Sequence, residues 1–69
     1  MKSVSGAQFA KILEKHGWKL LRVKGSHHVY GKPGQIERIS LPIHGSQSLK
    51  IGLLRHFLKV AGLEEADLT

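Results

Sequence analysis

The sequence predicts a two-layer α+β domain in which two helices pack on one face of a three-stranded antiparallel sheet. Apolar residues recur at helical spacing near both ends of the chain, over 5–16 and from residue 48 or 50 to 61. Between them, the segments 18–24, 27–30 and 37–43 are rich in strand-forming side chains and are separated by turn residues. Two amphipathic helices need the same apolar sheet face to bury against, so the order helix, three strands, helix predicts two layers.

The first predicted helix begins at Ser5, because Ser5 and Gln8 have the spacing of a capping box. Val4 and Phe9 stand where a hydrophobic staple would fix the entry of the chain. The apolar face carries Phe9, Ile12, Leu13 and His16. Gly17 can adopt the left-handed conformation that ends a helix, so we expect the helix to stop at residue 16.

The three predicted strands are bounded by turn signals. Residues 18–24 interleave Lys and Arg with large apolar side chains, and Gly25-Ser26 interrupts them. Residues 27–30 end at the turn 31–34, in which a proline fixes φ. Along 37–43 the side chains alternate, with Ile39, Leu41 and Ile43 on one face and Arg38 and Ser40 on the other. This strand is expected to stop at Pro42, which cannot donate to a ladder.

The second predicted helix runs from Ser48 or Lys50 to Ala61, and Gly62 ends it. Its apolar stripe consists of Leu53, Leu54, Phe57, Leu58, Val60 and Ala61. Its opposite face carries Arg55, His56 and Lys59. Both helices therefore have one face to bury and one to expose.

Length and composition predict one small soluble domain over residues 1–69. A chain of 69 residues buries too little surface for a two-domain cleft or a large cofactor pocket. It has no cysteine, which excludes disulfides, thiolate metal sites and a cysteine nucleophile and fits a reducing compartment. No segment approaches the roughly 20 apolar residues of a membrane helix, and the first ten lack a signal-peptide core. We therefore expect a cytoplasmic protein with no membrane contact and no cofactor.

Charge is concentrated in the body of the chain. Residues 1–63 hold all 11 Lys and Arg but only Glu14 and Glu37 among the carboxylates. A basic body of this size is expected to bind a polyanion, since Lys and Arg release condensed counterions from phosphates. The acidic tail, Glu64, Glu65 and Asp67, is expected to extend the last helix or to stay solvated.

Five histidines are the candidates for proton transfer, because the ordinary pKa of histidine is about 6.5. His16 closes the first helix, and His56 lies on the polar face of the second. His44, in a loop, has either a turn role or a substrate contact. Residues 1–63 have only two carboxylates, Glu14 and Glu37, which gives little support to the paired-carboxylate site of a glycosidase.

His27 and His28 are adjacent on a predicted strand, so their side chains point to opposite faces and cannot bind one metal ion together. No metal site is therefore expected. One of the two faces the helices and the other faces solvent beside the cations. If Tyr30 is a core residue, His27 is outside, and if Val29 is the core residue, His28 is outside.

Gly25-Ser26 has two readings. Glycine lets a phosphate approach the backbone and Ser26 supplies a hydroxyl donor, which would suit a binding site. A two-residue hairpin turn is the structural alternative, and the two residues alone favour it.

Four motifs give a resemblance that covers nearly the whole chain. They are Gly17-Trp18, the run from Arg22 to Tyr30 with its Gly-Ser-His-His core, Leu41-Pro42-Ile43-His44-Gly45, and the run 58–63. In their order and spacing the chain resembles the HicA (YcfA-like) family. The resemblance implies a double-stranded-RNA-binding-domain-like α-β-β-β-α fold and an mRNA interferase, the toxin of a type II toxin-antitoxin pair. It also implies a HicB-type antitoxin as partner and a toxin that is monomeric alone.

Within the family the essential histidine is the first after Gly-Ser, so the resemblance implies His27 as the catalytic residue and Gly25 as the motif glycine. Cleavage would be metal-independent, with His27 taking the proton of a ribose 2′-hydroxyl. The expected RNA-binding residues are Gly25, Ser26, Lys24, Arg22, His28, Lys32 and Lys50. His28, Ser26 and Tyr30 are candidates for the second proton transfer. The chain departs from the family at 50–53, where relatives often read Lys-Pro-Gly-Thr, and at Ser48, where an acidic residue is common.

Two other functions fit the same residues. A noncatalytic RNA-binding module would use the basic face for shape and phosphate contacts alone. A protein-interaction subunit would dock an acidic partner on it and have no affinity for RNA.

Overall fold

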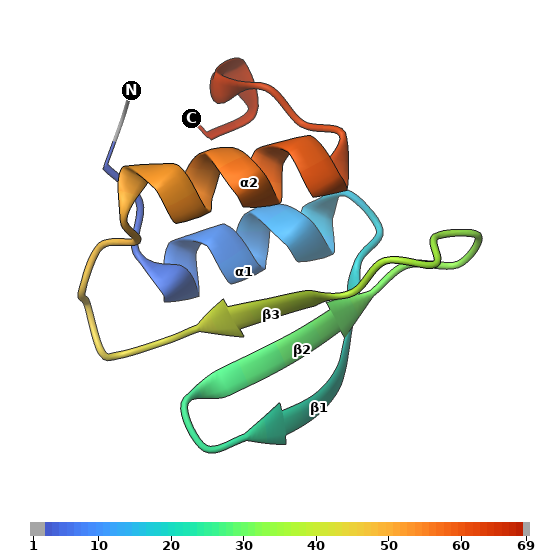
Figure 1. Cartoon of the computed structure of the whole chain (residues 1–69), viewed down its shortest axis with the longest axis horizontal. Coiled ribbons are helices and arrows are strands. Elements are labelled where there is room, and N and C mark those ends of the chain that lie inside the picture. Colours follow the sequence, from blue (N-terminus) through green and yellow to red (C-terminus); the bar gives the residue numbers. More distant parts are fainter. Residues whose placement is uncertain (1–2, 69) are drawn as a thin grey trace.

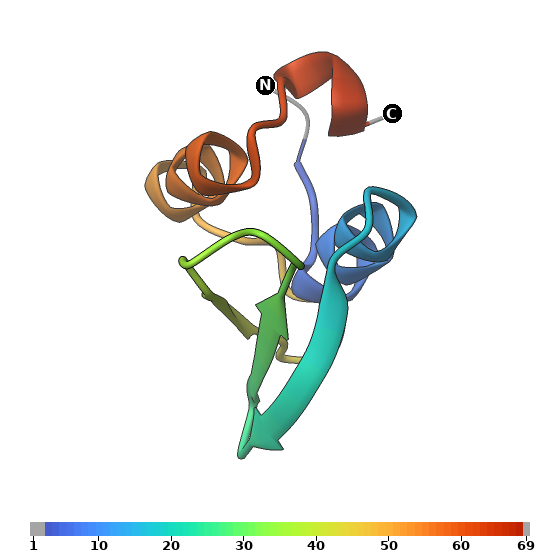
Figure 2. The same ribbon diagram turned by 90° about the vertical axis from the view of Figure 1, so that its right-hand side faces the viewer.

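The computed structural model describes residues 3–68, so the expected domain of residues 1–69 extends beyond the described residues at both ends. The elements are α1 (Gly6–Lys15), β1 (Lys19–Lys24), β2 (His27–Gly31), β3 (Ile39–Pro42), α2 (Ile51–Ala61) and the 3-10 helix η1 (Glu65–Leu68). The strands form one antiparallel sheet in the order β1-β2-β3. Both helices cover the same face of this sheet (Figures 1 and 2). The predicted two-layer α+β architecture is confirmed.

Helix α1 begins as its sequence predicts. The Gln8 backbone N–H donates to Ser5 Oγ at 3.2 Å, and the Ser5 N–H donates to Gln8 Oε1 at 3.0 Å, which completes the capping box. Val4 and Phe9, the expected staple, are both buried. Gly17 follows the helix with φ 94°.

Helix α2 begins at Ile51, directly after Lys50, so the alternative start at Ser48 is too early. The residues before it pair with the N-terminal stretch instead, because the Leu49 N–H donates to the Val4 carbonyl at 2.8 Å. Lys50 is the N-cap and makes no capping hydrogen bond with its side chain. Gly62 ends the helix in the left-handed conformation, as predicted.

The core lies between the helices and the inner face of the sheet. The rings of Phe9 from α1 and Phe57 from α2 stack with their centroids 5.9 Å apart. The sheet contributes three buried residues, Tyr30, Ile39 and Leu41. Each fully buried side chain of this size contributes about 1.5–3 kcal/mol through burial, which holds the two helices on the sheet.

Burial of Tyr30 decides which face of β2 is the inner one. Tyr30 is 3 % exposed, and His28 shares its face, opposite Val23 and Leu41 in the neighbouring strands. His27 therefore lies on the outer face, which the helices leave uncovered. This settles the alternative that the alternation of β2 left open.

A β-bulge in β1 determines the composition of the outer face. Leu20 pairs with Tyr30 and Arg22 pairs with Val29, so Leu21 is the extra residue between them. Strict alternation would put Lys19 and Arg22 on opposite faces. With the bulge, both cations lie on the outer face together with Lys24.

The acidic tail does not extend α2, so the first of its two expected alternatives is wrong, whereas Glu64 and Glu65 are exposed to solvent as the second one predicts. The left-handed turn at Gly62 redirects the chain, and the Leu63 N–H returns to the Leu58 carbonyl at 2.9 Å. The tail then forms η1, which buries Leu68 against the core. It lies on the helical side of the molecule, away from the outer sheet face (Figure 2). None of the helices in residues 3–68 is long and apolar enough to cross a bilayer.

Candidate functional site

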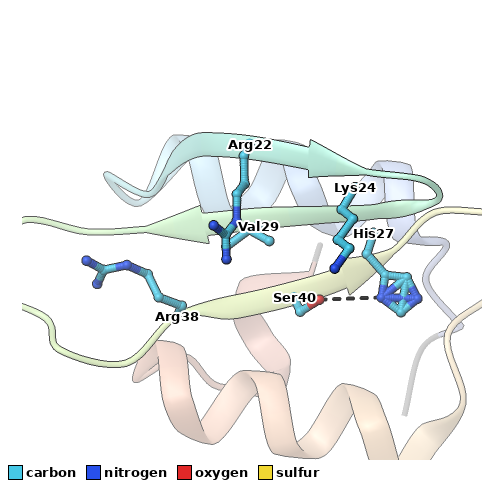
Figure 3. A pocket seen from close by; sticks show the side chains of 6 residues that line it. All are labelled: Arg22, Lys24, His27, Val29, Arg38 and Ser40. Atoms are coloured by element: carbon cyan, nitrogen blue, oxygen red, sulfur yellow. Dashed lines mark hydrogen bonds between the residues drawn. The ribbon is translucent and has the colours of Figure 1, made fainter.

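The outer sheet face contains a shallow hollow of about 560 Å³ near the β1–β2 turn. We call it the histidine hollow, and its lining consists of Arg22, Lys24, His27, Val29, Arg38 and Ser40 (Figure 3). Strands β1 and β2 contribute two of these side chains each, β3 contributes Ser40, and Arg38 directly precedes β3. None of the described lining residues carries a carboxylate, so the hollow is cationic and suits an anionic ligand.

A tight turn places His27 at the rim. Gly25 has φ 60° whereas Ser26 does not have a positive φ, which matches a type II′ hairpin turn. A Cβ at Gly25 would meet nothing within 4 Å, so this glycine serves the backbone and leaves open space in front of it. The Ile43 N–H donates to the Ser26 carbonyl at 2.8 Å, which ties the turn to the chain after β3. The hairpin alternative for Gly25-Ser26 is thus correct, and the open space is compatible with ligand approach as well.

Ser40 is the hydrogen-bond partner of His27. Its Oγ lies 3.4 Å from His27 Nδ1, a long hydrogen bond between exposed side chains of neighbouring strands (Figure 3). The direction of donation depends on the tautomer. When Ser40 accepts from Nδ1–H, the lone pair of the neutral imidazole is on Nε2, where it can accept a proton from a ligand.

The cations around His27 differ in how they are held. Arg22 and Lys24 extend from β1 across β2 (Figure 3). The Arg38 side chain leads away from His27, and its Nη1 donates to the carbonyls of Gln35 at 2.9 Å and Ile36 at 3.2 Å. Gln35 is in turn fixed to α2, because its Nε2 donates to the Val60 carbonyl at 3.1 Å. Arg38 is therefore anchored, whereas the two β1 cations can follow a ligand.

The family profile described as the HicA toxin of bacterial toxin-antitoxin matches residues 6–63, which include the whole histidine hollow. The chain belongs to the HicA toxin family. Its role is therefore that of a toxin, and the family implies an antitoxin partner. A comparison with curated proteins found no match.

In this HicA chain, the structure gathers only some of the predicted site residues. Arg22, Lys24 and His27 line one hollow, with Gly25 and Ser26 in the adjoining turn. Lys32 lines a second hollow at the other end of the outer face. Lys50 lines a third, together with Pro42 and His44, beside the start of α2.

His28 and Tyr30 are on the helix side of the sheet and do not face the histidine hollow. His28 Nδ1 is buried and has no hydrogen-bond partner among the described residues. Burial, and secondarily the Glu14 carboxylate, raises the pKa of the Tyr30 hydroxyl above its ordinary value. Neither side chain is placed to donate a proton to a ligand beside His27. The expectation that His28 binds RNA, and that either residue supplies the second proton transfer, stays a prediction, and it concerns side chains on the opposite face from His27.

Three lining residues of the HicA site were missed by sequence reasoning: Val29, Arg38 and Ser40. Alternation had placed Arg38 and Ser40 on one face of the third strand. Only the pairing of Ser40 with Val29 shows that this face is the one that carries His27. Within residues 3–68, no three or more His, Asp or Glu side chains are grouped so that they could share a metal ion.

Proposed function

We propose that this HicA toxin is an mRNA interferase, a metal-independent endoribonuclease whose catalytic base is His27, and that a HicB-type antitoxin neutralises it. The observation that carries this proposal is an exposed histidine on an open sheet face, in a hollow that Arg22, Lys24 and Arg38 also line. Histidine is the side-chain type that exchanges protons near neutral pH, and phosphates are the anions that such cations attract.

In the proposed reaction, His27 Nε2 removes the proton of a ribose 2′-hydroxyl. The 2′-oxygen attacks the adjacent phosphorus, the bond from phosphorus to the 5′-oxygen breaks, and the departing oxygen takes a proton from water. The products are a 2′,3′-cyclic phosphate and a 5′-hydroxyl. DNA lacks the 2′-hydroxyl and is not a substrate.

Arg22 and Lys24 would offset the negative charge that develops on the nonbridging phosphate oxygens. Gly25 and Ser26 would border the scissile phosphate, because the turn leaves open space in front of Gly25. Lys32 would hold a phosphate further along the face. Lys50 lies beyond the end of β3, so RNA would reach it only by continuing past that edge.

The proposal is tested by incubating the purified toxin with a defined mRNA in EDTA and mapping the cut. We expect cleavage to continue in EDTA and to leave a 2′,3′-cyclic phosphate. The same RNA with a single 2′-deoxyribose 5′ to the cut should bind but remain whole. Cleavage of this deoxy-substituted RNA at the same position would contradict the mechanism, and binding without any cleavage would favour the noncatalytic RNA-binding module.

Removing the two β1 cations should weaken RNA binding in a salt-dependent way. The double variant Arg22→Ser/Lys24→Ser is expected to bind about tenfold less tightly at low salt, and its log–log salt slope should fall by about 1.4. Affinity for the antitoxin should fall too, since a partner that neutralises the toxin would cover this face. Fluorescence anisotropy titrations at several salt concentrations measure the affinity for RNA with its salt slope, and the affinity for the antitoxin.

The matched control is Arg55→Ser/Lys59→Ser, which removes the same charge from the exposed face of α2. It should change RNA affinity by less than about twofold, because screened charges on the helical side do not contact the RNA. Equal losses in the two double variants would mean that RNA responds to net charge and not to the outer face.

A further inference from the structure

A second hollow, of about 210 Å³, adjoins the histidine hollow on the outer sheet face. We call it the Gly31 hollow, and its lining consists of Lys19, Leu21, Gly31, Lys32, Pro33 and Arg38. Arg38 also lines the histidine hollow, so the two hollows are neighbours on the same face. A polymer lying on His27 can therefore continue into the Gly31 hollow without leaving the face.

The bulge and a glycine create this hollow. As the extra residue of the bulge, Leu21 lies on the outer face and is 53 % exposed. Gly31 contributes no side chain, and a Cβ there would lie 2.6 Å from Leu21 Cδ1 and 3.1 Å from Arg38 Cδ. The Leu21 and Arg38 side chains thus close over the buried Gly31 backbone, and Leu21 and Pro33 form an apolar wall of the hollow.

The chemistry of the Gly31 hollow differs from that of the histidine hollow. Its surface is almost entirely apolar, although Lys19, Lys32 and Arg38 surround it. An apolar surface ringed by cations matches a ligand that is flat and apolar in one part and anionic in another. A nucleotide has both parts, since its base presents a π-face and its phosphate a charge.

The Gly31 hollow lies at a distance from His27 that suits a nucleotide close to the cleaved bond. Gly31 follows His27 by four residues on the same face of one strand, so about 13 Å separate them along the strand. The Arg38 side chain lies against Gly31, on the far side from His27, and its guanidinium is fixed by the Gln35 and Ile36 carbonyls. A guanidinium held in this way can stack on a base that has left its own stack.

From these observations we infer that the Gly31 hollow binds the base of a nucleotide near the scissile bond of single-stranded RNA, while Lys19 and Lys32 hold its phosphates. The inference rests on the proposed function for the place of the cut. Burying a base here requires that it be unpaired, so duplex RNA is excluded from this subsite. The apolar wall carries no hydrogen-bonding group for a base edge, so the subsite accepts any base.

The test uses an RNA with one mapped cut, made uncleavable by a 2′-deoxyribose, in which a single abasic position is moved along the strand. For the wild-type toxin, one abasic position near the cut should weaken binding about fivefold, since stacking contributes roughly 1 kcal/mol at its weak end. In Leu21→Ser this penalty should disappear. In Ile51→Ser, which removes a side chain that is 56 % exposed at the start of α2, it should persist.

A second comparison does not depend on Leu21. Lys32→Ser should weaken binding of the intact RNA about threefold, whereas Lys59→Ser on α2 should not. A flat abasic profile in the wild type, or an unchanged penalty in folded Leu21→Ser, would overturn the inference. So would a loss of antitoxin affinity in Leu21→Ser with RNA binding intact, because the hollow would then be a protein-docking surface.

The two proposals can fail separately. If the toxin binds RNA and never cuts it, the abasic scan is run on a short RNA that limits sliding, and a penalty removed by Leu21→Ser still supports the subsite. If the toxin cuts RNA with a flat abasic profile, only the subsite is lost. A toxin with no affinity for RNA would overturn both.

Discussion

His27→Ala is expected to lower the rate of RNA cleavage by about 10²- to 10⁴-fold, the usual contribution of a general base, and to leave RNA affinity within about twofold. The rate falls because no other described side chain of the histidine hollow accepts a proton readily at neutral pH. Affinity survives because Arg22, Lys24 and Arg38 remain in place. Cleavage is measured with EDTA present, and anisotropy on the deoxy-substituted RNA gives the affinity.

His56→Ala is the control for this experiment. His56 is an exposed histidine on α2, so its removal changes composition in the same way without touching the outer sheet face. Circular dichroism melts should show all three proteins folded. If His27→Ala cleaves as fast as the wild type, His27 is not the base, or the activity belongs to a contaminating nuclease.

The start of α1 and the end of α2 were predictable because local chemistry fixes them, whereas the start of α2 has no capping side chain. Ser5 and Gln8 satisfy each other's orphan backbone groups, and Gly62 adopts a conformation that other residues avoid. The η1 turn was not predictable, since burial of Leu68 against the core is a long-range contact. A leucine beside three carboxylates carries no local signal for burial.

The site was predictable to the extent that it is local. Arg22, Lys24 and His27 belong to one hairpin, and a two-residue turn brings them together. Arg38 and Ser40 reach the site through the pairing of β2 with β3, which alternation within one strand does not specify. The choice between His27 and His28 likewise depended on whether Tyr30 or Val29 is buried.

The Gly31 hollow was hidden from the sequence by the bulge in β1. Strict alternation along β1 would put Lys19 and Arg22 on opposite faces and Leu21 on the inner face. The strand would then be an ordinary amphipathic one. One extra residue reverses that assignment for the first part of β1 and exposes Leu21. Bulges of this kind re-aim side chains at functional edges, and their position follows from tertiary packing.

The start of α1 packs against the end of β3 on the helix side of the sheet, and this contact supports the strand that carries Ser40 on the outer face. Gly6, the first residue of α1, is buried, and a Cβ at this position would overlap the Pro42 carbonyl oxygen and lie 3.1 Å from Ile43 Cα. These are backbone atoms, which cannot rotate away as a flexible side chain can. Any side chain at residue 6 must therefore push α1 away from the end of β3.

Gly6→Ala is accordingly expected to lower the free energy of unfolding by about 2 kcal/mol, the usual cost of overpacking, and the melting temperature by roughly 10 °C. Gly52→Ala is the matched control, because Gly52 is an exposed glycine in the first turn of α2 and its Cβ would meet nothing within 4 Å. Alanine loses less backbone entropy than glycine on folding, so Gly52→Ala should raise stability by about 0.5 kcal/mol. Urea titrations of the two variants should therefore shift in opposite directions. Shifts in the same direction would mean that α1 does not approach β3 through Gly6, and the support of the strand that carries Ser40 would have to lie elsewhere.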